Sequence, residues 1–405
     1  MKPIVRAGRM KPVHSDIRGP LFVEAMKRQK QGIDILKLNT GNPATFGFGL
    51  PDSIKNALME HMQDGVGYCD FKGMPQARQA ICDYETSKGI KGITPDDVFI
   101  GNGVSEVVSF ALTPLLNDED EVLVPSPSYS LWGNSVYLED GKPVFYTCDE
   151  QANWYPDIQD IRSKITDKTK AIVIINPNNP TGVLYPKELL LEIIQIARES
   201  GLLIFADEIY DRLVMDGKQH ISLASLTEDV PVITLNGLSK SHCLCGYRCG
   251  WMVISGPREL TEDYRQGIIQ LTSLRLCANT MAQIVIPAAL DDMETPASMV
   301  RPGGRIYEQR EATVRELEKI DGLSFVKNDA AFYVFPKLDV KKFNITNDKQ
   351  FAHDLLDVTN ILLVPGSGFD WKNPDHFRIV MLPQADILSD AIRRMGTFLD
   401  GYKQK

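Results

Sequence analysis

The run AIVII at residues 171–175 decides the fold class of this chain. A short, continuously apolar run is typical of a strand buried on both faces of a sheet, and the turn-forming sequence NPNNPTG follows it at residues 176–182. A helical pattern occupies residues 186–200, and a second apolar run, LLIFA, occupies residues 202–206. Strands that alternate with helices in this way indicate a parallel sheet with helices on both faces.

The alternation extends in both directions from this unit. Further strands are predicted at residues 98–100, 121–124, 143–146 and 232–235, and a further helix at residues 105–116. In open parallel sheets, function lies at the carboxyl ends of the strands. Asn179, Asp207 and Lys240 each follow the carboxyl end of a predicted strand.

The pattern changes near residue 290. A charged amphipathic helix is predicted at residues 304–320, followed by short strands at residues 331–335, 361–364 and 377–381 and by a closing helix. A chain of 405 residues suits two domains better than one core. We therefore expect an α/β protein with a large domain, built on a mostly parallel sheet between helices, and a smaller α+β domain.

Composition excludes several classes of partner. The 44 Lys and Arg residues against 53 Asp and Glu residues give a net charge of −9, and no basic run stands out, so nucleic acid is not an expected partner. Anionic substrates remain possible, because a few focused arginines can override a weakly negative whole. The polar N-terminus lacks the apolar core of a signal peptide, and no apolar run reaches the length of a membrane span. Both observations favour the cytoplasm and no membrane partner.

The cysteine pattern points to reduced thiols. Seven cysteines is an odd number, and their irregular spacing does not resemble a disulfide framework. Cys243, Cys245 and Cys249 cluster just after Lys240, but the spacing of the first two is too tight for a usual zinc pair. No metal site is therefore expected.

Lys240 has the features of an imine-forming lysine. It follows the apolar run at residues 232–235, and such a lysine must be shielded or crowded by positive charge to spend time unprotonated. The obvious cofactor is pyridoxal phosphate, an electron sink for carbanions next to an amino group. Asp207 could keep the pyridine nitrogen of that ring protonated, and Asn179 and Tyr210 could donate to its phenolic oxygen.

The phosphate and ring of this cofactor make further demands. The turn at residues 101–105 precedes a predicted helix and could supply backbone N–H groups, and Arg248 could supply a cation. Tyr129 follows a Pro-Ser-Pro turn and could stack on the ring. Taken singly, each of these residues has an ordinary explanation, such as a turn, packing, a helix-terminal acid or a surface ion pair. Taken jointly and in order, at successive strand ends, ordinary explanations become improbable.

These motifs resemble one family along the whole chain. The matching segments are NPTG at residues 179–182, DEIY at residues 207–210, SK at residues 239–240, Arg248 and FR at residues 377–378. They are similar to those of the fold-type I, class I/II pyridoxal-phosphate-dependent aminotransferases. Within this family the chain most resembles the bacterial glutamate–pyruvate (alanine) aminotransferases, through residues 16–20, 41–43, 67–70, 100–106 and 275–279.

The resemblance implies an organisation and a set of roles. Residues 1–45 would form an N-terminal arm that joins the small domain, residues 46–289 the large cofactor-binding domain and residues 290–405 the small domain. Lys240 would hold pyridoxal 5'-phosphate as an internal aldimine and move the substrate proton, in a reversible ping-pong exchange. The other implied roles are pairing with the pyridine nitrogen by Asp207, contact with the phenolic oxygen by Asn179 and Tyr210, stacking by Tyr129, and phosphate binding by Gly103, Val104, Ser105, Ser239 and Arg248.

On the substrate side, the resemblance implies that Arg378 and Asn179 bind the α-carboxylate and that Gly41 lets the backbone approach the substrate. Tyr68 would reach the cofactor phosphate of a neighbouring subunit, which implies a homodimer with shared active sites. The Asn179–Pro180 bond is cis in such proteins. A second carboxylate, as in glutamate, needs a cation, and Arg18 is the candidate, although it could equally serve only to pin the arm. Many relatives carry a hydroxyl where this chain has Gly237, which puts the phosphate affinity in question.

We therefore expect transamination between L-alanine and 2-oxoglutarate, giving pyruvate and L-glutamate. A branched-chain, aromatic or aspartate donor is an alternative, as is β-elimination on the same cofactor, since one fold supports many chemistries. A regulatory sensor that binds the cofactor is a further alternative. It is disfavoured because the arm begins near residue 1 and no basic helix-turn-helix segment is present.

Overall fold

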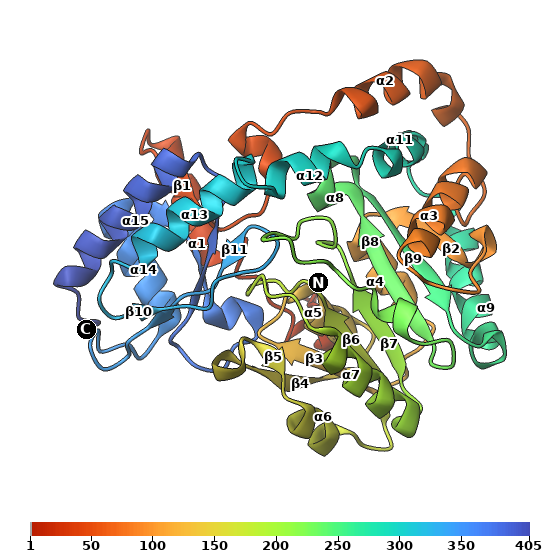
Figure 1. The fold of residues 1–405 in the computed structure, drawn as a ribbon. Helices are drawn as coiled ribbons and strands as arrows, with labels where there is room; N and C mark the ends of the chain where they lie inside the picture. The colour runs from red at the N-terminus through yellow and green to blue at the C-terminus, as the bar shows by residue number, and fades with distance from the viewer. Residues whose placement is uncertain (1) are drawn as a thin grey trace.

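A computed structural model describes residues 2–405 and contains a central sheet of eight strands (Figure 1). The strand order is β2 (Val98–Asn102), β9 (Cys249–Ser255), β8 (Val232–Gly237), β7 (Leu203–Asp207), β6 (Thr169–Ile175), β3 (Glu121–Ser126), β4 (Lys142–Asp149) and β5 (Tyr155–Pro156). The pairs from β8 to β4 are all parallel, whereas β9 is antiparallel to both of its neighbours. The mostly parallel α/β sheet is confirmed, and β9 is a strand that the sequence prediction missed.

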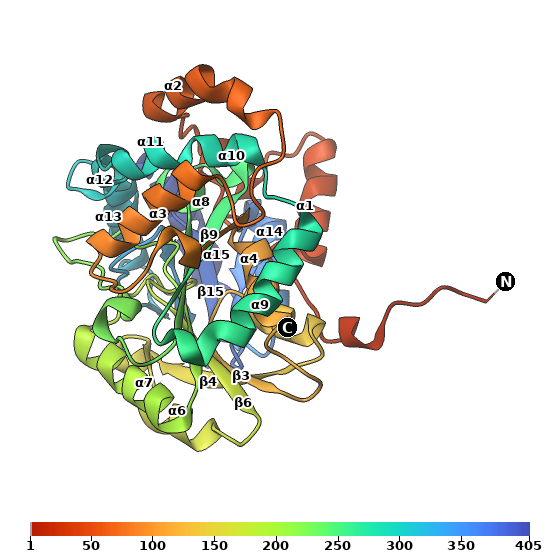
Figure 2. The same cartoon turned by 90° about the vertical axis from the view of Figure 1, so that its right-hand side faces the viewer.

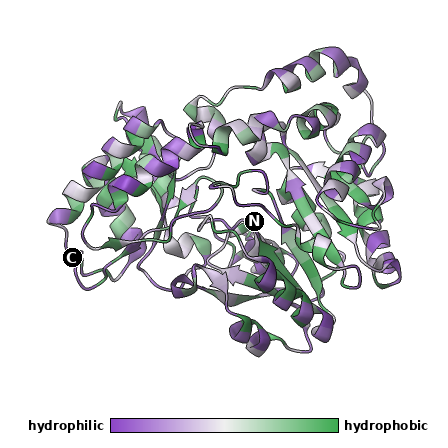
Figure 3. Cartoon of the chain, viewed as in Figure 1, coloured by the Kyte–Doolittle hydropathy of each residue, from purple (hydrophilic) through white to green (hydrophobic). Residues whose placement is uncertain are grey.

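The run at residues 171–175 shows why the sheet is buried on both sides. Ile172 and Ile174 pack into one core with α6 (Ile158–Lys164) and α7 (Lys187–Ser200), whereas Val173 and Ile175 pack into another. Helices α4 (Val104–Leu112), α5 (Leu131–Leu138) and α9 (Arg258–Arg275) cover this second face. Successive side chains of a strand point to opposite faces, so both faces of this strand had to be apolar. Figure 3 shows the apolar strands enclosed by helices with polar outer surfaces.

A third group of helices packs at the β2–β9 end of the sheet. Its members are α2 (Asp52–His61), α3 (Pro75–Ser87), α10 (Thr280–Ile284) and α11 (Ile286–Asp291). The short α8 (Leu238–Ser241) follows β8 directly and carries Lys240. Across residues 2–405 no single helix is long and apolar enough to cross a membrane; only α9 taken together with residues 280–291, across a bend of 119°, reaches that length and composition.

The C-terminal part has its own core. Helices α13 (Arg305–Leu317), α14 (Asp348–Thr359) and α15 (Ala385–Asp400) pack with short strands, after α12 (Glu294–Val300). The short strands are β10 (Leu323–Ser324), β11 (Tyr333–Val334), β12 (Lys337–Leu338), β13 (Ile361–Leu362), β14 (Val364–Pro365) and β15 (Phe377–Val380). The strand predicted at residues 361–364 is thus two short strands, and the helix predicted at residues 304–320 is shorter at both ends.

The N-terminal segment contacts this C-terminal part. Helix α1 (Pro20–Lys30) packs against α14, and β1 (Leu36–Lys37) pairs in parallel with β13. The residues ahead of the helical turn Gly8–Met10 extend away from the body, as Figure 2 shows. These contacts support our proposal of an arm at residues 1–45, a large domain at residues 46–289 and a small domain at residues 290–405.

Candidate active site

A cavity of about 860 Å³ opens at the carboxyl ends of the parallel strands. Strands β6, β7 and β8 end on it, the N-terminal segment and α5 close its sides, and Tyr333 and Arg378 reach it from the C-terminal part. Twelve of the residues predicted from the sequence line this one cavity: Arg18, Gly41, Val104, Ser105, Tyr129, Asn179, Asp207, Tyr210, Ser239, Lys240, Arg248 and Arg378.

Lys240 lies half-buried near the centre of these residues. Its Nζ atom donates a hydrogen bond to the carbonyl oxygen of Gly41 at 3.0 Å and lies 5.7 Å from the ring centroid of Phe332. No carboxylate of residues 2–405 lies within 4.0 Å of it. Burial opposes the charged amine, but Tyr333, Cys245 and Tyr129 together raise its pKa. Lys240 thus has a carbonyl oxygen but no carboxylate beside it in the described structure.

Asp207 ends β7 and is buried. Its Oδ2 atom accepts a hydrogen bond from Trp132 Nε1 at 3.1 Å, and its Oδ1 atom accepts one from the backbone N–H of Ile209 at 3.4 Å. Burial is the main cause that raises the pKa of this carboxyl to about 6. A buried carboxylate with so high a pKa gains most from a cationic neighbour, and a protonated pyridine nitrogen is such a neighbour.

Arg378 is a buried arginine of β15. Its guanidinium donates from Nη1 to Asn179 Oδ1 at 2.9 Å and from Nη2 to the carbonyl oxygen of Asn39, and its Nε atom has no partner in the described structure. The pKa of Arg378 is lowered by burial. A buried fork of donors with no carboxylate partner suits a ligand carboxylate.

The first turn of α4 and Arg248 form a potential phosphate site. The N–H groups of the first turn of a helix have no acceptor within the helix, and Val104 and Ser105 line the cavity there. Gly103 precedes them at a φ of +83°, and a Cβ atom on it would lie 2.2 Å from Arg248 Nη2. Gly103 does not itself line the cavity, but the absence of its side chain lets the guanidinium approach this turn.

Tyr210 and Tyr333 face each other across the cavity floor. Their hydroxyl groups share a hydrogen bond of 2.8 Å. The hydroxyl of Tyr333 also lies where a Cβ atom on Gly41 would be, 2.4 Å away. The absence of a side chain at Gly41 thus makes room for the Tyr333 hydroxyl, in addition to any room that it leaves for a substrate.

The charges on the cavity wall are strongly unbalanced. Four cations, Arg18, Lys240, Arg248 and Arg378, line the cavity, whereas Asp207 is the only acidic residue on it in the described structure. None of the four has a carboxylate within 4.0 Å among residues 2–405. The cavity is therefore built for anions in a protein whose net charge is −9.

Tyr68 lies away from this cavity. It is 84% exposed and borders a second, shallow hollow with Cys277, Asn279 and Thr280. A residue that serves a neighbouring subunit would be exposed in a single chain, so its predicted role stays a prediction.

The structure explains why residue 237 is a glycine. It pairs with Gly250 across β8 and β9, and a Cβ atom on it would lie 2.6 Å from the carbonyl oxygen of Cys249. Gly250 in turn leaves room for the backbone of Gly103 and Val104. The hydroxyl carried by many relatives does not fit here without a backbone shift, and phosphate binding would depend on the α4 turn, Ser239 and Arg248.

The three clustered cysteines do not converge. Cys245 Sγ donates to the carbonyl oxygen of Ser239 at 2.9 Å, whereas Cys249 packs in an apolar core. In the part of the chain that the structure describes, Glu208, Asp211 and His220 are the one set of side chains placed to share a metal ion. The ammonium group of Lys88 already bonds both of those carboxylates, at 2.8 and 3.2 Å.

Three further residues are parts of the site that the sequence prediction missed, and Asn39 contributes through its backbone carbonyl oxygen. Trp132 orients Asp207, Asn39 receives Arg378, and Tyr333 contacts Tyr210. Each is distant in sequence from its partner, and none lies in a recognisable motif. A buried carboxylate at a strand end needs hydrogen-bond donors, and this need is the one signal that could have suggested Trp132 as a partner of Asp207. The Asn179–Pro180 peptide bond is cis, as predicted.

The fold and this cavity define a transferase that handles amino and carboxylate groups on a lysine-bound cofactor. A family model described as "Aminotransferase class I and II" matches residues 33–392, and the chain belongs to this family. Members of the family use pyridoxal phosphate, and the residues described above fit its nitrogen, ring and phosphate.

Individual relatives are similar over their full lengths. The chain is 50% identical over 404 residues to the glutamate-pyruvate aminotransferase AlaA of Haemophilus influenzae, with 100% of both chains covered. The crystal structure of an aminotransferase from Escherichia coli superposes with a TM-score of 0.98, at 47% identity and 100% coverage of both chains. The alanine aminotransferase from Pyrococcus furiosus superposes with a TM-score of 0.93, at 40% identity, over 98% of this chain and 100% of that one.

Proposed function

We propose that this aminotransferase exchanges the amino group between L-alanine and 2-oxoglutarate, giving pyruvate and L-glutamate, in a reversible ping-pong reaction. The observation that carries the proposal is the set of four cations without carboxylate partners around a single buried carboxylate. The full-length similarity to proteins named glutamate-pyruvate and alanine aminotransferases supports the choice of substrates.

Pyridoxal phosphate, when bound, supplies an electron sink that makes the Cα–H bond of an amino acid acidic. Lys240 would hold the cofactor through Nζ. Once free, its amine would move a proton between the substrate Cα and the cofactor. Asp207 would hold a proton on the pyridine nitrogen, since its high pKa marks a carboxylate that gains from a cationic partner. Tyr210 and Asn179 would donate to the phenolic oxygen, and Tyr129 would stack on the ring.

Arg378 would bind the α-carboxylate that alanine, glutamate and both oxo acids share. Its Nε atom is buried without a partner, and its two Nη atoms are held by Asn179 and Asn39. A planar guanidinium that is already oriented loses little entropy when a carboxylate arrives. Arg248, Ser239 and the turn at Gly103, Val104 and Ser105 would hold the phosphate.

Arg18 would receive the second carboxylate of glutamate or 2-oxoglutarate. It lines the cavity from the N-terminal arm and has no carboxylate within 4.0 Å in the described structure. Alanine has no such group, so a small apolar side chain needs only the α-carboxylate clamp. An exposed arm residue at the cavity wall can thus bind one substrate without contacting the other.

We further propose a cytoplasmic homodimer in which Tyr68 completes the neighbouring site. The exposed Tyr68 beside the Cys277–Thr280 hollow supports a subunit contact there. Seven cysteines without disulfides in residues 2–405 are typical of a reducing compartment.

A half-reaction screen tests the proposal. Purified protein is loaded with pyridoxal phosphate and mixed with single amino acids while the visible absorbance of the cofactor is followed. We expect conversion with alanine and glutamate and little with aromatic, branched-chain or aspartate donors. Repeated release of pyruvate from a cysteine derivative with a leaving group on Cβ, without any oxo-acid acceptor, would favour a lyase. The absence of any cofactor band would contradict the whole proposal.

A further inference from the structure

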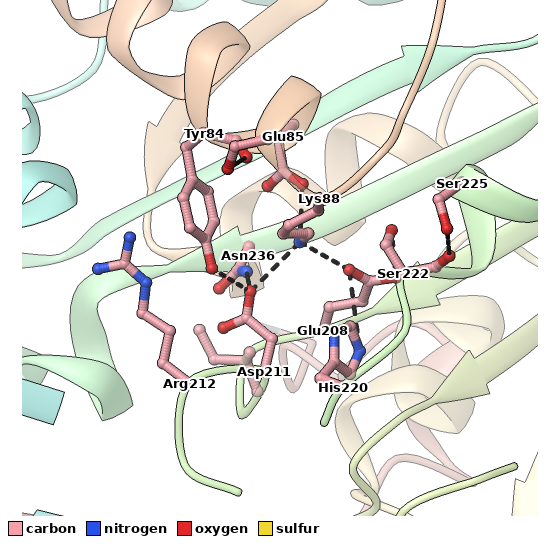
Figure 4. A network of polar contacts seen from close by, with 12 residues as sticks. Tyr84, Glu85, Lys88, Glu208, Asp211, Arg212, His220, Ser222, Ser225 and Asn236 are labelled. Carbon is pink, nitrogen blue, oxygen red and sulfur yellow. Dashed lines mark hydrogen bonds and ion pairs between the residues drawn. The ribbon is translucent and has the colours of Figure 1, made fainter. Parts of the chain in front are cut away.

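A buried cluster of charged side chains lies beside the ends of β7 and β8, and none of its members lines the active-site cavity (Figure 4). At its centre is Lys88, just after α3, whose side chain is 13% exposed. Its Nζ atom lies 2.7 Å from Glu85 Oε2, 2.8 Å from Glu208 Oε2 and 3.2 Å from Asp211 Oδ2. The cofactor and substrate roles proposed above use none of these four side chains.

Two carboxylates of the cluster, Asp211 and Glu208, also accept hydrogen bonds from neutral donors. Asp211 Oδ2 also accepts hydrogen bonds from Tyr84 at 2.5 Å and from Asn236 Nδ2 at 2.7 Å. Glu208 Oε1 accepts from Ser222 Oγ at 2.9 Å and from the N–H of Leu223 at 3.0 Å. Burial raises the pKa of Asp211, but Lys88, together with His220 and the hydrogen bond from Tyr84, holds that pKa below its usual value.

The cluster is attached to the strand ends that carry the reactive groups. Glu208 and Asp211 belong to the turn after β7, which also bears Asp207 and Tyr210. Asn236 lies near the end of β8, and its Oδ1 atom accepts the N–H of Gly237 at 2.7 Å, three residues before Lys240. A third strand is reached through His220, whose Nε2 donates to the carbonyl oxygen of Asn176 just after β6.

We propose that Lys88 is a positioning residue for transamination, because its buried ammonium group fixes the ends of β7 and β8 relative to each other and thereby orients Asp207 and Lys240. The inference rests on the proposed function for the reaction that it serves. Without this cation, three buried carboxylates face one another, and the turn after β7 moves away from Asn236. Displacing Asp207 or Lys240 by about 1 Å from its productive position would reduce both the cofactor affinity and the reaction rate.

Two variants separate positioning from stability. Lys88→Met removes the ammonium group from the cluster. Arg265→Met removes the cation of another buried ion pair, with Asp97 at 2.6 Å, which lies just before the edge strand β2. Lys91→Met is a surface control, since Lys91 is exposed and pairs only with the exposed Glu228.

The measurements are the thermal unfolding of the apoprotein and the dissociation constant of pyridoxal phosphate, read from its visible absorbance at a temperature where every variant is folded. We expect both Lys88→Met and Arg265→Met to unfold at lower temperature, but only Lys88→Met to bind the cofactor roughly tenfold or more weakly. Equal cofactor affinity in Lys88→Met and wild type would overturn the inference.

Chemical rescue gives a second readout. In Lys88→Ala, ethylammonium chloride should restore part of the cofactor affinity, because the partly exposed pocket admits a small ammonium ion, whereas sodium chloride at the same ionic strength should not. Equal effects of both salts would count against the inference. If Lys88→Met fails to fold, the double variant Lys88→Met/Glu208→Gln removes one negative charge with the positive one. Wild-type cofactor affinity in that double variant would again overturn it.

The proposed function fails in a different way. If wild type binds no cofactor or does not complete the alanine half-reaction, the proposed function is contradicted. If wild type does both and Lys88→Met equals it in cofactor affinity, only the positioning role of Lys88 is contradicted.

Discussion

Arg310 and Arg378 are both fully buried arginines, but their surroundings differ. Arg310 donates two hydrogen bonds to Asp216, at 2.6 and 2.7 Å, and Asp216 outweighs burial to raise its pKa. Arg378 has only neutral acceptors, and burial lowers its pKa. Burying a guanidinium without a counter-charge is costly, and of the three buried arginines, Arg265, Arg310 and Arg378, only Arg378 lacks a carboxylate partner in the described structure and lines the cavity.

The difference separates two sets of cations. Lys240 and Arg378 lack carboxylate partners within 4.0 Å in the described structure and line the cavity. Lys88, Arg265 and Arg310 have carboxylate partners and lie outside it. Two other half-buried arginines, Arg212 and Arg305, belong to neither set, because they bond backbone carbonyl oxygens and lie outside the cavity. Removing a member of the first set should cost function and spare the apoprotein, whereas removing a member of the second should cost stability.

Replacing Lys240 with Ala should have the largest effect. The proton at the substrate Cα then has no amine to receive it, and we expect a loss of roughly 10⁴-fold in kcat. The apoprotein should unfold at the same or a higher temperature, because an unpaired charge has been removed. Single-turnover absorbance with alanine and apoprotein calorimetry measure the two effects. An apoprotein destabilised as much as by Arg310→Met would break the division.

Arg378→Met should reduce kcat/KM for both alanine and glutamate by about 10²–10³-fold, since a buried charged hydrogen-bond pair is worth about 3–4 kcal/mol. Arg378→Lys keeps the charge but not the fork and should recover only part of the activity. Steady-state kinetics with both donors check this. A selective loss for one donor would contradict a role at the α-carboxylate that the two donors share.

Much of this division could be predicted from the sequence, and the reason is local. Asn179, Asp207 and Lys240 each follow an apolar run, and parallel strands bring their carboxyl ends to one edge. The partners of the paired cations could not be predicted in the same way. Arg310 and Asp216 are 94 residues apart, and Arg265 and Asp97 are 168 apart. No period or motif links such residues, so only the folded chain shows which cations are neutralised.

The same limit explains the strands and side chains that were missed. β9 follows Arg248 within a few residues and reads CGWMVIS, with a glycine that lowers its strand signal. Its need for glycine is clear only when β2 and β8 lie on either side of it, because Gly250 pairs with both Gly101 and Gly237. Trp132 and Tyr333 likewise gain their roles from partners brought close by the fold.

Arg310→Met should show the opposite behaviour to Arg378→Met. It leaves Asp216 without its main partner, and because the side chain of Asp216 is 35% exposed, the loss should be about 1–3 kcal/mol of unfolding free energy, less than for a fully buried pair. Because neither residue lines the cavity, kcat/KM of the folded enzyme should stay within about twofold of wild type. Urea unfolding and steady-state kinetics measure the two quantities. A loss of activity without a loss of stability would contradict the assignment of Arg310 to the paired, stabilising cations.

Arg18 tests whether an exposed cavity cation behaves like the buried ones. Arg18→Ala should raise KM for glutamate and 2-oxoglutarate about tenfold and leave KM for alanine unchanged, because exposed charge pairs contribute only about 1 kcal/mol. Arg18→Lys is the matched control and should retain most of the preference. Equal losses for alanine and glutamate would mean that Arg18 only pins the arm.

His14 is a titratable member of the paired set, and its effect should be the smallest. It lies on the arm, with Nε2 3.0 Å from Asp370 and Nδ1 3.7 Å from Asp16, and these carboxylates raise its pKa to about 9. A folded-state pKa above the unfolded value of 6.5 means that the stabilisation is fully present below pH 6.5 and is lost as the pH rises through about 9. The imidazole is 36% exposed, so solvent screening keeps this contribution modest. The difference in unfolding temperature between wild type and His14→Gln should therefore shrink from pH 6 to pH 10, and a difference that does not change with pH would show that His14 is not held as a cation.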